Sequence, residues 1–431
     1  MNKFLMRVLT LCLLCVVLTA CQSESPYEVV LRPTQTPDVI TTHTTAPMTT
    51  TQISDTDLPV QTPAAATDEI QTNTPEPTAA PEETTPAPTA TPDPKPEKDM
   101  HFYVQRESKE VQTLFWQVYD AVLQHKQSID LPKNTPRERI ERVAWLLHVD
   151  CPELFWFSHL SEYSFMEKEP NVILSAKIDY HMDGEKAAKA QKEIDALLEK
   201  WRTELTNAAE YEKELFVHDA LINRCRYADS SKHDGTAYGA LILGKARCQG
   251  YANALCLGLR CMGVECAVVT GTATNASGTE SHAWNLMKID GTWTLTDATW
   301  NDPIGRDTKL YAYFNVTDAM MSKNHTQDDA FDRYDLPQCT SLKQNFCTKN
   351  GRYVKSAEDV KKAVTEWAVA YLENKTAPNM LCFEDEAQYT EALSLLSECF
   401  QAAADQTGKV PEGGSFHYLK EEGANYLQFD E

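Results

Sequence analysis

The residues best suited to chemistry in this chain are a cysteine, a histidine and an aspartate. Cys248 stands between Lys-Ala-Arg and Gln-Gly-Tyr, His282 lies within Ser-His-Ala-Trp-Asn, and Asp297 lies within Leu-Thr-Asp-Ala-Thr-Trp. A thiol, an imidazole and a carboxylate are the nucleophile, the general base and the orienting group of a thiol-based acyl-transfer site. These residue types therefore predict catalysis through a thioester.

The segment that begins at Cys248 is predicted to form a buried helix. Apolar residues lie on nearly every side of it, and Gly263 is a typical helix end. Cys248 then occupies the first turn, where free backbone N–H groups and the helix dipole favour a thiolate over a thiol. The positive charge of Arg247, directly before Cys248, also favours the thiolate. Because cysteines in apolar helices are mostly inert, we interpret Cys256 and Cys261 as core residues.

A predicted two-residue turn brings the histidine and the aspartate together. Asp-Gly at 290–291 lies between two segments with strand patterns, which is a strong hairpin signal. If these residues form the turn, Ile289 faces Thr292, and His282 and Asp297 become diagonal neighbours on one face of the sheet. The backbones of such neighbours lie roughly 7–8 Å apart across the two strands, close enough for a side-chain hydrogen bond. The carboxylate can then hold the imidazole while its other nitrogen faces the cysteine.

These motifs resemble the transglutaminase-like superfamily, in particular its secreted bacterial branch. The resemblance runs from about His218 to His325, about a quarter of the chain, and its three blocks come in a fixed order. The matching pieces are Ala237–Ala240, Cys248–Tyr251, His282–Asn285, Asp297–Pro303 and Tyr313–Thr317. It implies a papain-like α+β core with Cys248 as nucleophile, His282 as base and Asp297 as orienting group. Ala298 stands where a valine commonly follows the aspartate, and this departure leaves the three catalytic residue types unchanged.

Three neighbouring residues have weaker assignments. Tyr238 could supply a second oxyanion donor beside the backbone N–H of Cys248, or it could pack its ring against the helix. Trp284 shares a strand face with His282, where it either shields the imidazole–carboxylate pair from water or is ordinary core. Asn285 points to the opposite face and receives no catalytic role.

The N-terminal segment indicates where this chemistry takes place. Lys3 and Arg7 precede an apolar run, and Leu18-Thr-Ala-Cys21 resembles the lipobox of bacterial lipoproteins. We expect residues 1–20 to be a signal peptide, too short to remain as a spanning helix, and Cys21 to be lipidated. The alternative is an ordinary secretory signal with a chance cysteine. The expected location is the extracellular face of the bacterial cell membrane, held by the lipid anchor.

Residues 21–99 are expected to form a disordered tether. Threonine and proline dominate, and 14 of the 22 prolines of the chain lie between Gln22 and Asp99. Such a composition buries too little apolar surface to fold, and its prolines favour an extended polyproline conformation. At about 3.1 Å per residue, the extended tether would reach on the order of 200 Å, which suits display beyond a thick cell wall.

Three folded regions are predicted after the tether. Helical periodicity in 100–206 indicates a helical accessory region, which we expect to pack on a catalytic core at 207–345. Its aromatic segment 151–157 is interpreted as packing rather than as the lining of a cleft. Residues 346–431 mix helical patterns with short apolar strands, which indicates a small α+β region of unassigned function. The fold class is accordingly α+β: a papain-like transglutaminase core with a helical N-terminal region and a small α+β C-terminal appendage.

The 13 cysteines do not predict a fully paired framework. Two leave with the signal peptide and Cys21 is lipidated, so ten remain, and nine if Cys248 is free. Possible bridges that spacing alone cannot establish are Cys339–Cys347 and Cys382–Cys399. The histidines are scattered singly, and the sequence has no HExxH motif and no phosphate-binding glycine loop. We therefore predict neither a metal site nor a cofactor.

Charge and context narrow the expected partners and reaction. The net charge of −23 disfavours nucleic acid and anionic lipid. A Cys–His–Asp site converts an amide to a thioester and passes the acyl group to water or to an amine, and the triad does not distinguish these outcomes. Because an anchored enzyme faces bulk water, we expect a cysteine peptidase or amidase that acts on peptide, protein or cell-wall peptide amides. The alternatives are a protein cross-linking transglutaminase and a catalytically silent module that binds peptides or glycans.

Overall fold

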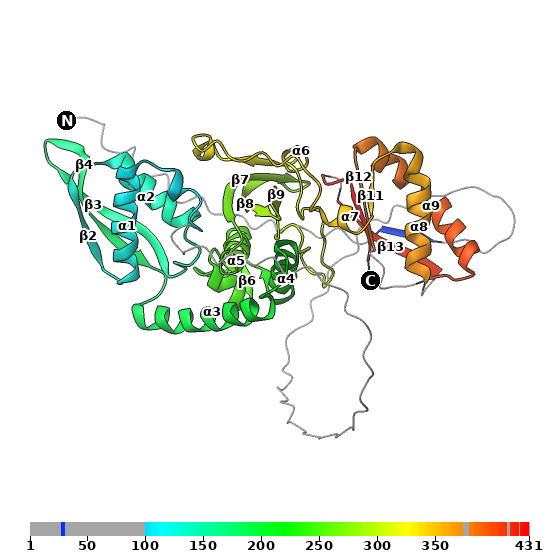
Figure 1. Cartoon of the computed structure of the whole chain (residues 1–431), viewed down its shortest axis with the longest axis horizontal. Coiled ribbons are helices and arrows are strands. Elements are labelled where there is room, and N and C mark those ends of the chain that lie inside the picture. The colour runs from blue at the N-terminus through cyan, green and yellow to red at the C-terminus, as the bar shows by residue number, and fades with distance from the viewer. Residues whose placement is uncertain (1–26, 31–99, 374–378, 412–413, 422, 431) are drawn as a thin grey trace, which may run out of the picture. The chain divides into compact units, whose positions relative to one another are not determined.

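The computed structural model describes residues 27–30, 100–373, 379–411, 414–421 and 423–430 (Figure 1). The predicted signal peptide, the lipidation site at Cys21 and almost all of the tether lie outside the described residues. The described part mixes helices and sheets, which confirms the α+β class. None of its helices is both long enough and apolar enough to cross a membrane.

The accessory region combines three helices with an antiparallel sheet. Its elements are α1 (Lys109–Leu123), β2 (Ser128–Pro136), α2 (Arg137–Val149), β3 (Phe157–Met166), β4 (Glu169–Tyr180) and α3 (Gly184–Glu204). The strands lie in the order β2-β4-β3, and α1 and α2 pack on each other and against the sheet (Figure 1). We predicted helices here but not the sheet. Register shifts interrupt the β3–β4 pairing at several points, so the alternation of period two that marks a strand is broken.

The core places two helices beside a four-stranded antiparallel sheet. Its elements are α4 (Glu210–Arg224), α5 (Cys248–Arg260), β7 (Cys266–Asn275), β8 (Gly278–Ile289), β9 (Thr292–Thr296) and β10 (His325–Gln327). The strand order is β10-β7-β8-β9, and α5 packs on β7 and β8. All residues of α5 from Gly250 onward are buried, which confirms the predicted buried helix.

The predicted hairpin has the expected register. Ile289 pairs with Thr292, and the ladder continues to Asn285 opposite Thr296. Asp290 and Gly291 form the turn with φ values of 45° and 79°. This left-handed backbone is the conformation that a type I′ turn requires at both central positions.

Short elements connect the larger ones. A parallel pair of strands, β5 (Arg226–Tyr227) and β6 (Lys245–Ala246), leads into α5 after a π-helical turn at Gly239–Leu243. The remaining short helices are α6 (Asp318–Met321), α7 (Phe346–Lys349) and 3-10 turns at Val104–Arg106, Asp329–Phe331 and Ala357–Asp359.

The C-terminal region has a sheet and an apolar cluster of its own. It contains β11 (Tyr353–Val354), α8 (Val360–Glu373), β12 (Met380–Phe383), α9 (Glu386–Thr407), β13 (Ser415–Glu421) and β14 (Tyr426–Phe429). Trp367, Phe400, Phe416 and Phe429 are fully buried within this cluster. The α+β appendage that we expected is therefore present.

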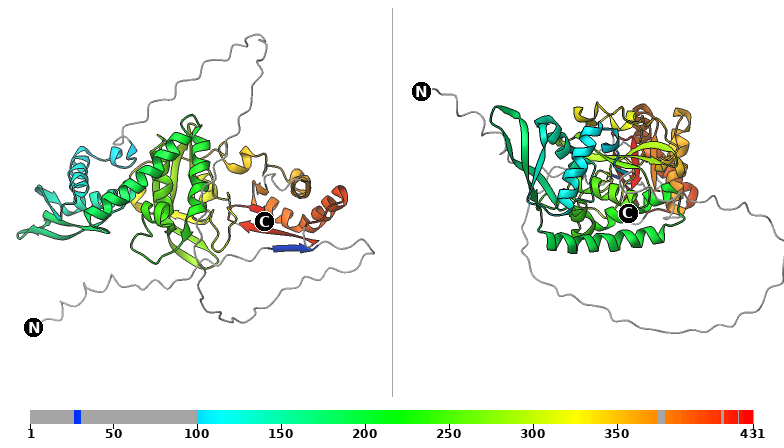
Figure 2. Two further views of the ribbon diagram at one scale, coloured as in Figure 1. Left: turned by 90° about the horizontal axis from the view of Figure 1, so that it is seen from below. Right: turned by 60° about the vertical axis from the view of Figure 1, so that its left-hand side comes forward.

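One part of the predicted tether is a strand. β1 (Tyr27–Val30) pairs antiparallel with β13 at the edge of the C-terminal sheet, where the blue strand lies beside the red ones in Figure 2. The prediction of disorder throughout 21–99 is therefore wrong for these four residues. Their sequence, Tyr-Glu-Val-Val, has the aromatic and β-branched side chains that favour a strand and lacks the threonine and proline of the rest.

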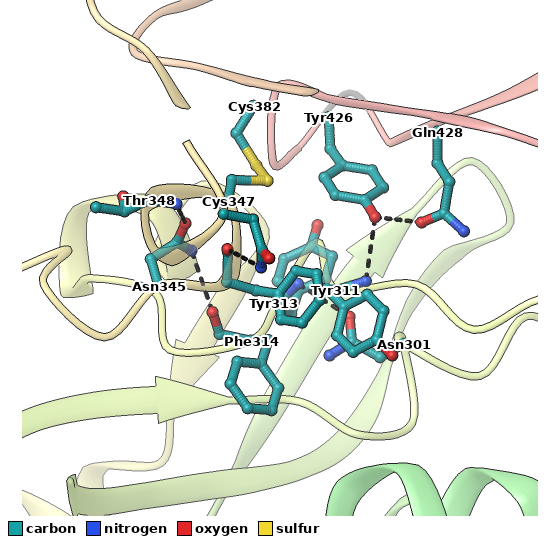
Figure 3. Close-up of a disulfide and its surroundings, with 12 residues drawn as sticks. Asn301, Tyr311, Tyr313, Phe314, Asn345, Cys347, Thr348, Cys382, Tyr426 and Gln428 are labelled. Carbon is teal, nitrogen blue, oxygen red and sulfur yellow. Dashed lines mark hydrogen bonds between the residues drawn. A yellow bond between two sulfur atoms is a disulfide. The ribbon is translucent and has the colours of Figure 1, made fainter. Parts of the chain in front are cut away.

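A disulfide joins α7 to β12 and links Cys347 to Cys382 (Figure 3). Both bridges considered from the sequence are wrong, because Cys339 and Cys399 are buried free thiols. Asn345 caps α7 and donates its amide to the carbonyl of Phe314, which holds Cys347 in place (Figure 3). Spacing along the chain carries no information about this contact between separate elements.

Candidate active site

Cys248 is the first residue of α5, as predicted, and is half-buried. The carbonyl of Asp234 accepts a hydrogen bond from the Arg247 N–H at 2.9 Å, so the preceding loop lies against this helix end. A Cβ at Gly250 would lie 2.4 Å from the same carbonyl oxygen, which explains the glycine of the Cys-Gln-Gly-Tyr motif. The first turn contains no acidic residue. The helix dipole at the thiol is therefore not opposed from within its own turn.

His282 and Asp297 are in direct contact. Nε2 of His282 lies 2.7 Å from Oδ2 of Asp297, and the two residues are 5% and 0% exposed. Burial lowers the pKa of His282, but the charge of Asp297 and the hydrogen bonds of the imidazole to Asp297 and Cys248 outweigh burial and raise it. Burial raises the pKa of Asp297, but the two histidines that face the carboxylate lower this pKa by more, so the net shift is downward. The contact therefore favours an imidazolium paired with a carboxylate.

The second oxygen of Asp297 fixes the carboxylate in its local turn. Oδ1 accepts hydrogen bonds from the backbone N–H groups of Thr299 at 2.9 Å and Trp300 at 3.1 Å. An aspartate that bonds to the backbone two and three residues ahead forms a turn with its own side chain. This turn follows β9 directly, so the hairpin and the Asp-Ala-Thr-Trp motif together aim the carboxylate at His282.

A second histidine, which the sequence analysis missed, also contacts Asp297. His325 begins β10, and its Nε2 lies 3.2 Å from the same Oδ2 that holds His282. β10 reaches this position because it pairs with β7 at Gly271, where a Cβ would lie 2.0 Å from the carbonyl oxygen of Thr326. The one signal in the sequence was the position of His325 at the end of the segment that resembles the superfamily.

The structure also locates the residues with weaker assignments. The ring of Tyr238 stacks on Phe155 at 5.4 Å. Burial is the main cause that raises the pKa of Tyr238, and the nearby charge of Glu193, to which its hydroxyl is hydrogen-bonded, raises this pKa as well. Its oxyanion role stays a prediction. The ring of Trp284 is buried and lies 6.3 Å from the His282 ring. Asn285 lies on the opposite face and donates to the carbonyl of Ala252 at 2.9 Å, which ties β8 to α5.

Comparison with known proteins identifies this part of the chain. Residues 199–298, which include Cys248, His282 and Asp297, match the core of the transglutaminase-like superfamily. They form a transglutaminase-like core. A stretch of 100 residues is 32% identical to Kyphoscoliosis peptidase of Mus musculus and of Homo sapiens, covering 20% of this chain. The chain thus spans only 15% of the length of these curated relatives.

Solved structures resemble the chain at lower identity. The crystal structure of a TGase is 15% identical, with a TM-score of 0.25, over 43% of this chain and 52% of the TGase chain. The periplasmic domain of TgpA from Pseudomonas aeruginosa, solved with ethylmercury, is 18% identical with a TM-score of 0.20. That match covers 26% of this chain and 44% of the TgpA chain.

A cavity of about 180 Å³ lies between the transglutaminase-like core and the accessory region. Arg247, Gln249 and Asn253 line it from α5 and its N-cap. The aromatic segment 151–157, which we interpreted as packing, is largely buried, and it also lines this cavity with Phe155 and Phe157. The segment therefore both packs and forms a wall next to the helix that carries the thiol.

Among the residues that the structure describes, two groups of side chains offer possible metal-ligating atoms within 4.8 Å of one another: His282, Asp297 and His325, and His101, Cys151 and Glu153. The sequence predicted neither group, since each includes members that are far apart along the chain. In the first group, hydrogen bonds join both histidines to the carboxylate. In the second group, Nε2 of His101 lies 2.9 Å from Oε1 of Glu153. Because members of each group bond directly to one another, we describe both groups as hydrogen-bonded clusters.

Proposed function

We propose that this chain is a cysteine peptidase or amidase that hydrolyses amide bonds of peptides, proteins or cell-wall peptides. The observation that carries the proposal is the buried His282–Asp297 hydrogen bond beside a cysteine at a helix N-terminus. Each of the three groups is in the environment that its role requires. The thiol is in the field of the helix dipole, and the imidazole is held by a carboxylate whose pKa is lowered.

The reaction proceeds in two balanced steps. The Cys248 thiolate attacks the amide carbonyl carbon, the C–N bond breaks, and the His282 imidazolium gives its proton to the leaving amine. Water then attacks the thioester while His282 takes a proton from it, which releases the carboxylic acid and restores the thiolate–imidazolium pair. The backbone N–H of Cys248, the first residue of α5, is the donor that we expect for the tetrahedral oxyanion.

Hydrolysis rather than amine transfer is favoured by exposure of the nucleophile. Cys248 is half-buried and open to water, and the bulk concentration of water far exceeds that of any lysine side chain. We further propose that Cys21 carries a lipid anchor and that the enzyme acts at the extracellular face of the bacterial membrane. The lipobox-like Leu-Thr-Ala-Cys sequence after the apolar run supports this location.

The test is the rate of iodoacetamide alkylation at single cysteines as a function of pH. Cys261 is an internal control, because it is a second half-buried free thiol at the opposite, C-terminal end of the same helix, and burial raises its pKa to about 12. We expect Cys248 to react well below the free-thiol pKa of about 8.5, whereas Cys261 does not. The advantage should disappear in His282→Ala. Equal, slow reaction of Cys248 in both proteins would favour a silent binding module instead.

A further inference from the structure

Both ring nitrogens of His325 face oxygen acceptors. Nε2 lies 3.2 Å from Oδ2 of Asp297, and Nδ1 lies 2.7 Å from Oδ1 of Asn324. The residue is 4% exposed, so water does not substitute for either partner. A neutral imidazole has one N–H and satisfies one acceptor, whereas an imidazolium satisfies two.

The orientation of the Asn324 amide follows from the groups beyond it. Nδ2 of Asn324 donates to the hydroxyl oxygen of Tyr313 at 2.6 Å, and this hydroxyl donates to Oε1 of Glu421 at 3.2 Å. If the amide were turned over, the single hydroxyl hydrogen of Tyr313 would have to serve both the amide oxygen and the carboxylate. The observed orientation leaves Oδ1 of Asn324 as an acceptor for His325. The whole chain of hydrogen bonds is satisfied when His325 carries two protons.

The surroundings of His325 suit a cation. The ring centroids of Trp300, Trp284 and Tyr313 lie 4.6, 5.1 and 5.5 Å from its own. An aromatic ring stabilises a positive charge that lies over its face within about 6 Å, and does so more strongly in a desolvated site. The titratable groups that face it are the Asp297 carboxylate, the His282 imidazole at 5.4 Å and the Tyr313 phenol.

We propose that His325 is a positioning residue of the active site, an imidazolium that holds Asp297 and is itself held by Asn324, Tyr313 and Glu421. This inference deepens the proposed function and rests on it. His325 touches no reacting atom; it acts on His282 and Cys248 through the carboxylate that it shares with His282. Its charge offsets that of Asp297, so that Asp297 orients His282 without excess negative charge near the thiolate.

The same hydrogen bonds give the C-terminal region a role. Glu421 is the last residue of β13, and Gly423 follows it in the turn toward β14. A Cβ at Gly423 would lie 2.2 Å from Nδ2 of Asn324 and 2.8 Å from the Tyr313 hydroxyl. The turn therefore packs directly on the pair that holds His325. The position of the C-terminal sheet is in this way transmitted to Asp297.

His325→Gln separates charge from structure, because glutamine keeps a donor and removes the cation. Loss of the cation leaves the negative charge of Asp297 unbalanced, which favours the imidazolium of His282 and disfavours the thiolate of Cys248. The pH profile of Cys248 alkylation by iodoacetamide has a lower limit, where the thiolate forms, and an upper limit, where the His282 imidazolium loses its proton. Both limits should therefore move to higher pH. At 5.4 Å between the two rings, and with an effective dielectric constant of about 20, we expect the limit set by His282 to shift by about 2 pH units.

Glu421→Ala tests the connection to the C-terminal region. Without the carboxylate, the Tyr313 hydroxyl is free to donate to the Asn324 amide, the amide turns over, and His325 loses its second acceptor. The profile should shift in the same direction by a smaller amount. Asp430→Ala is the matched control, since it breaks an ion pair of 2.8 Å with Arg306 between the same two regions, outside this chain of hydrogen bonds. It should leave the profile in place.

Nitrogen-15 NMR of the wild-type protein with labelled histidines tests the protonation of His325 independently of the proposed function. The expected spectrum at neutral pH has a hydrogen on both ring nitrogens of His325, identified by its loss in His325→Gln. A single N–H on His325, or a His325→Gln profile that is lower but unshifted, would overturn the inference. If Cys248 in the wild type is not activated at all, the proposed function fails, and the two N–H signals still decide the state of His325.

Discussion

A buried carboxyl group on α4 makes the stability of this protein depend on pH. Glu214 is 0% exposed; Oε1 accepts from the Thr296 hydroxyl at 3.1 Å and Oε2 from the Asn315 amide at 2.6 Å. Burial raises the pKa of Glu214 from its ordinary value of 4.5 to about 8, although these two hydrogen bonds lower it. Because Thr296 is the last residue of β9, the protonated carboxyl group anchors the end of this strand directly before Asp297.

The sign of the effect follows from the two pKa values. As pH rises from 4.5, the unfolded chain releases its proton while the folded chain keeps it, so the free energy of unfolding falls until pH passes about 8. At pH 7 the difference from 4.5 is 2.5 units, which corresponds to about 3 kcal/mol at about 1.36 kcal/mol per unit. This is a large part of the total of about 5–15 kcal/mol that is typical of a folded domain.

Glu214→Gln should remove this dependence. An amide is close in shape to the protonated acid and never ionises. Its oxygen accepts from the Asn315 amide, and its NH₂ group takes the place of the acid hydroxyl beside Thr296, whose hydroxyl then accepts instead of donating. We expect the variant to be about 3 kcal/mol more stable than the wild type at pH 7 and equally stable near pH 4, measured by urea unfolding across this range. Glu204→Gln makes the same charge change at an exposed position of α3 and serves as the control. Parallel curves for wild type and Glu214→Gln at all pH values would refute the reasoning.

Two further predictions concern the covalent features of the chain. Cys382→Ser opens the bridge to Cys347, which closes a loop of 35 residues, and should lower the free energy of unfolding by about 2–4 kcal/mol; a variant as stable as the wild type under oxidising conditions would contradict a formed bridge. Cys21→Ser should release the protein from the membrane fraction or leave its precursor unprocessed, as judged by fractionation and mass; unchanged processing and retention would show that Cys21 is not the anchor.

Features that depend on neighbouring residues were predictable from the sequence. The register of β8 and β9 follows from one Asp-Gly turn and a side-chain period of two, so a single local signal placed His282 near Asp297. The buried character of α5 followed in the same way from its composition. Strand β1 was missed because a four-residue strand inside a threonine- and proline-rich segment has no period long enough to detect.

Features that depend on contacts between distant elements were not predictable. The bulged β3–β4 pair has the interrupted alternation that hides a strand, and the Cys347–Cys382 bridge requires that α7 meets β12. His325 reaches the site only because β10 returns to β7 across Gly271. A lone histidine at the end of a motif is ambiguous until this pairing is known.

Asp297 shows where local and distant constraints meet. Its four hydrogen bonds come from residues at increasing distance along the chain: Thr299 and Trp300, then His282 at 15 residues, then His325 at 28. The local bonds fix how the carboxylate points, and the hairpin decides what it points at. The most distant bond brings in a second imidazole, which is connected through Asn324 and Tyr313 to Glu421. The orientation of the His282 imidazole is therefore a property of the assembled chain, including the C-terminal sheet.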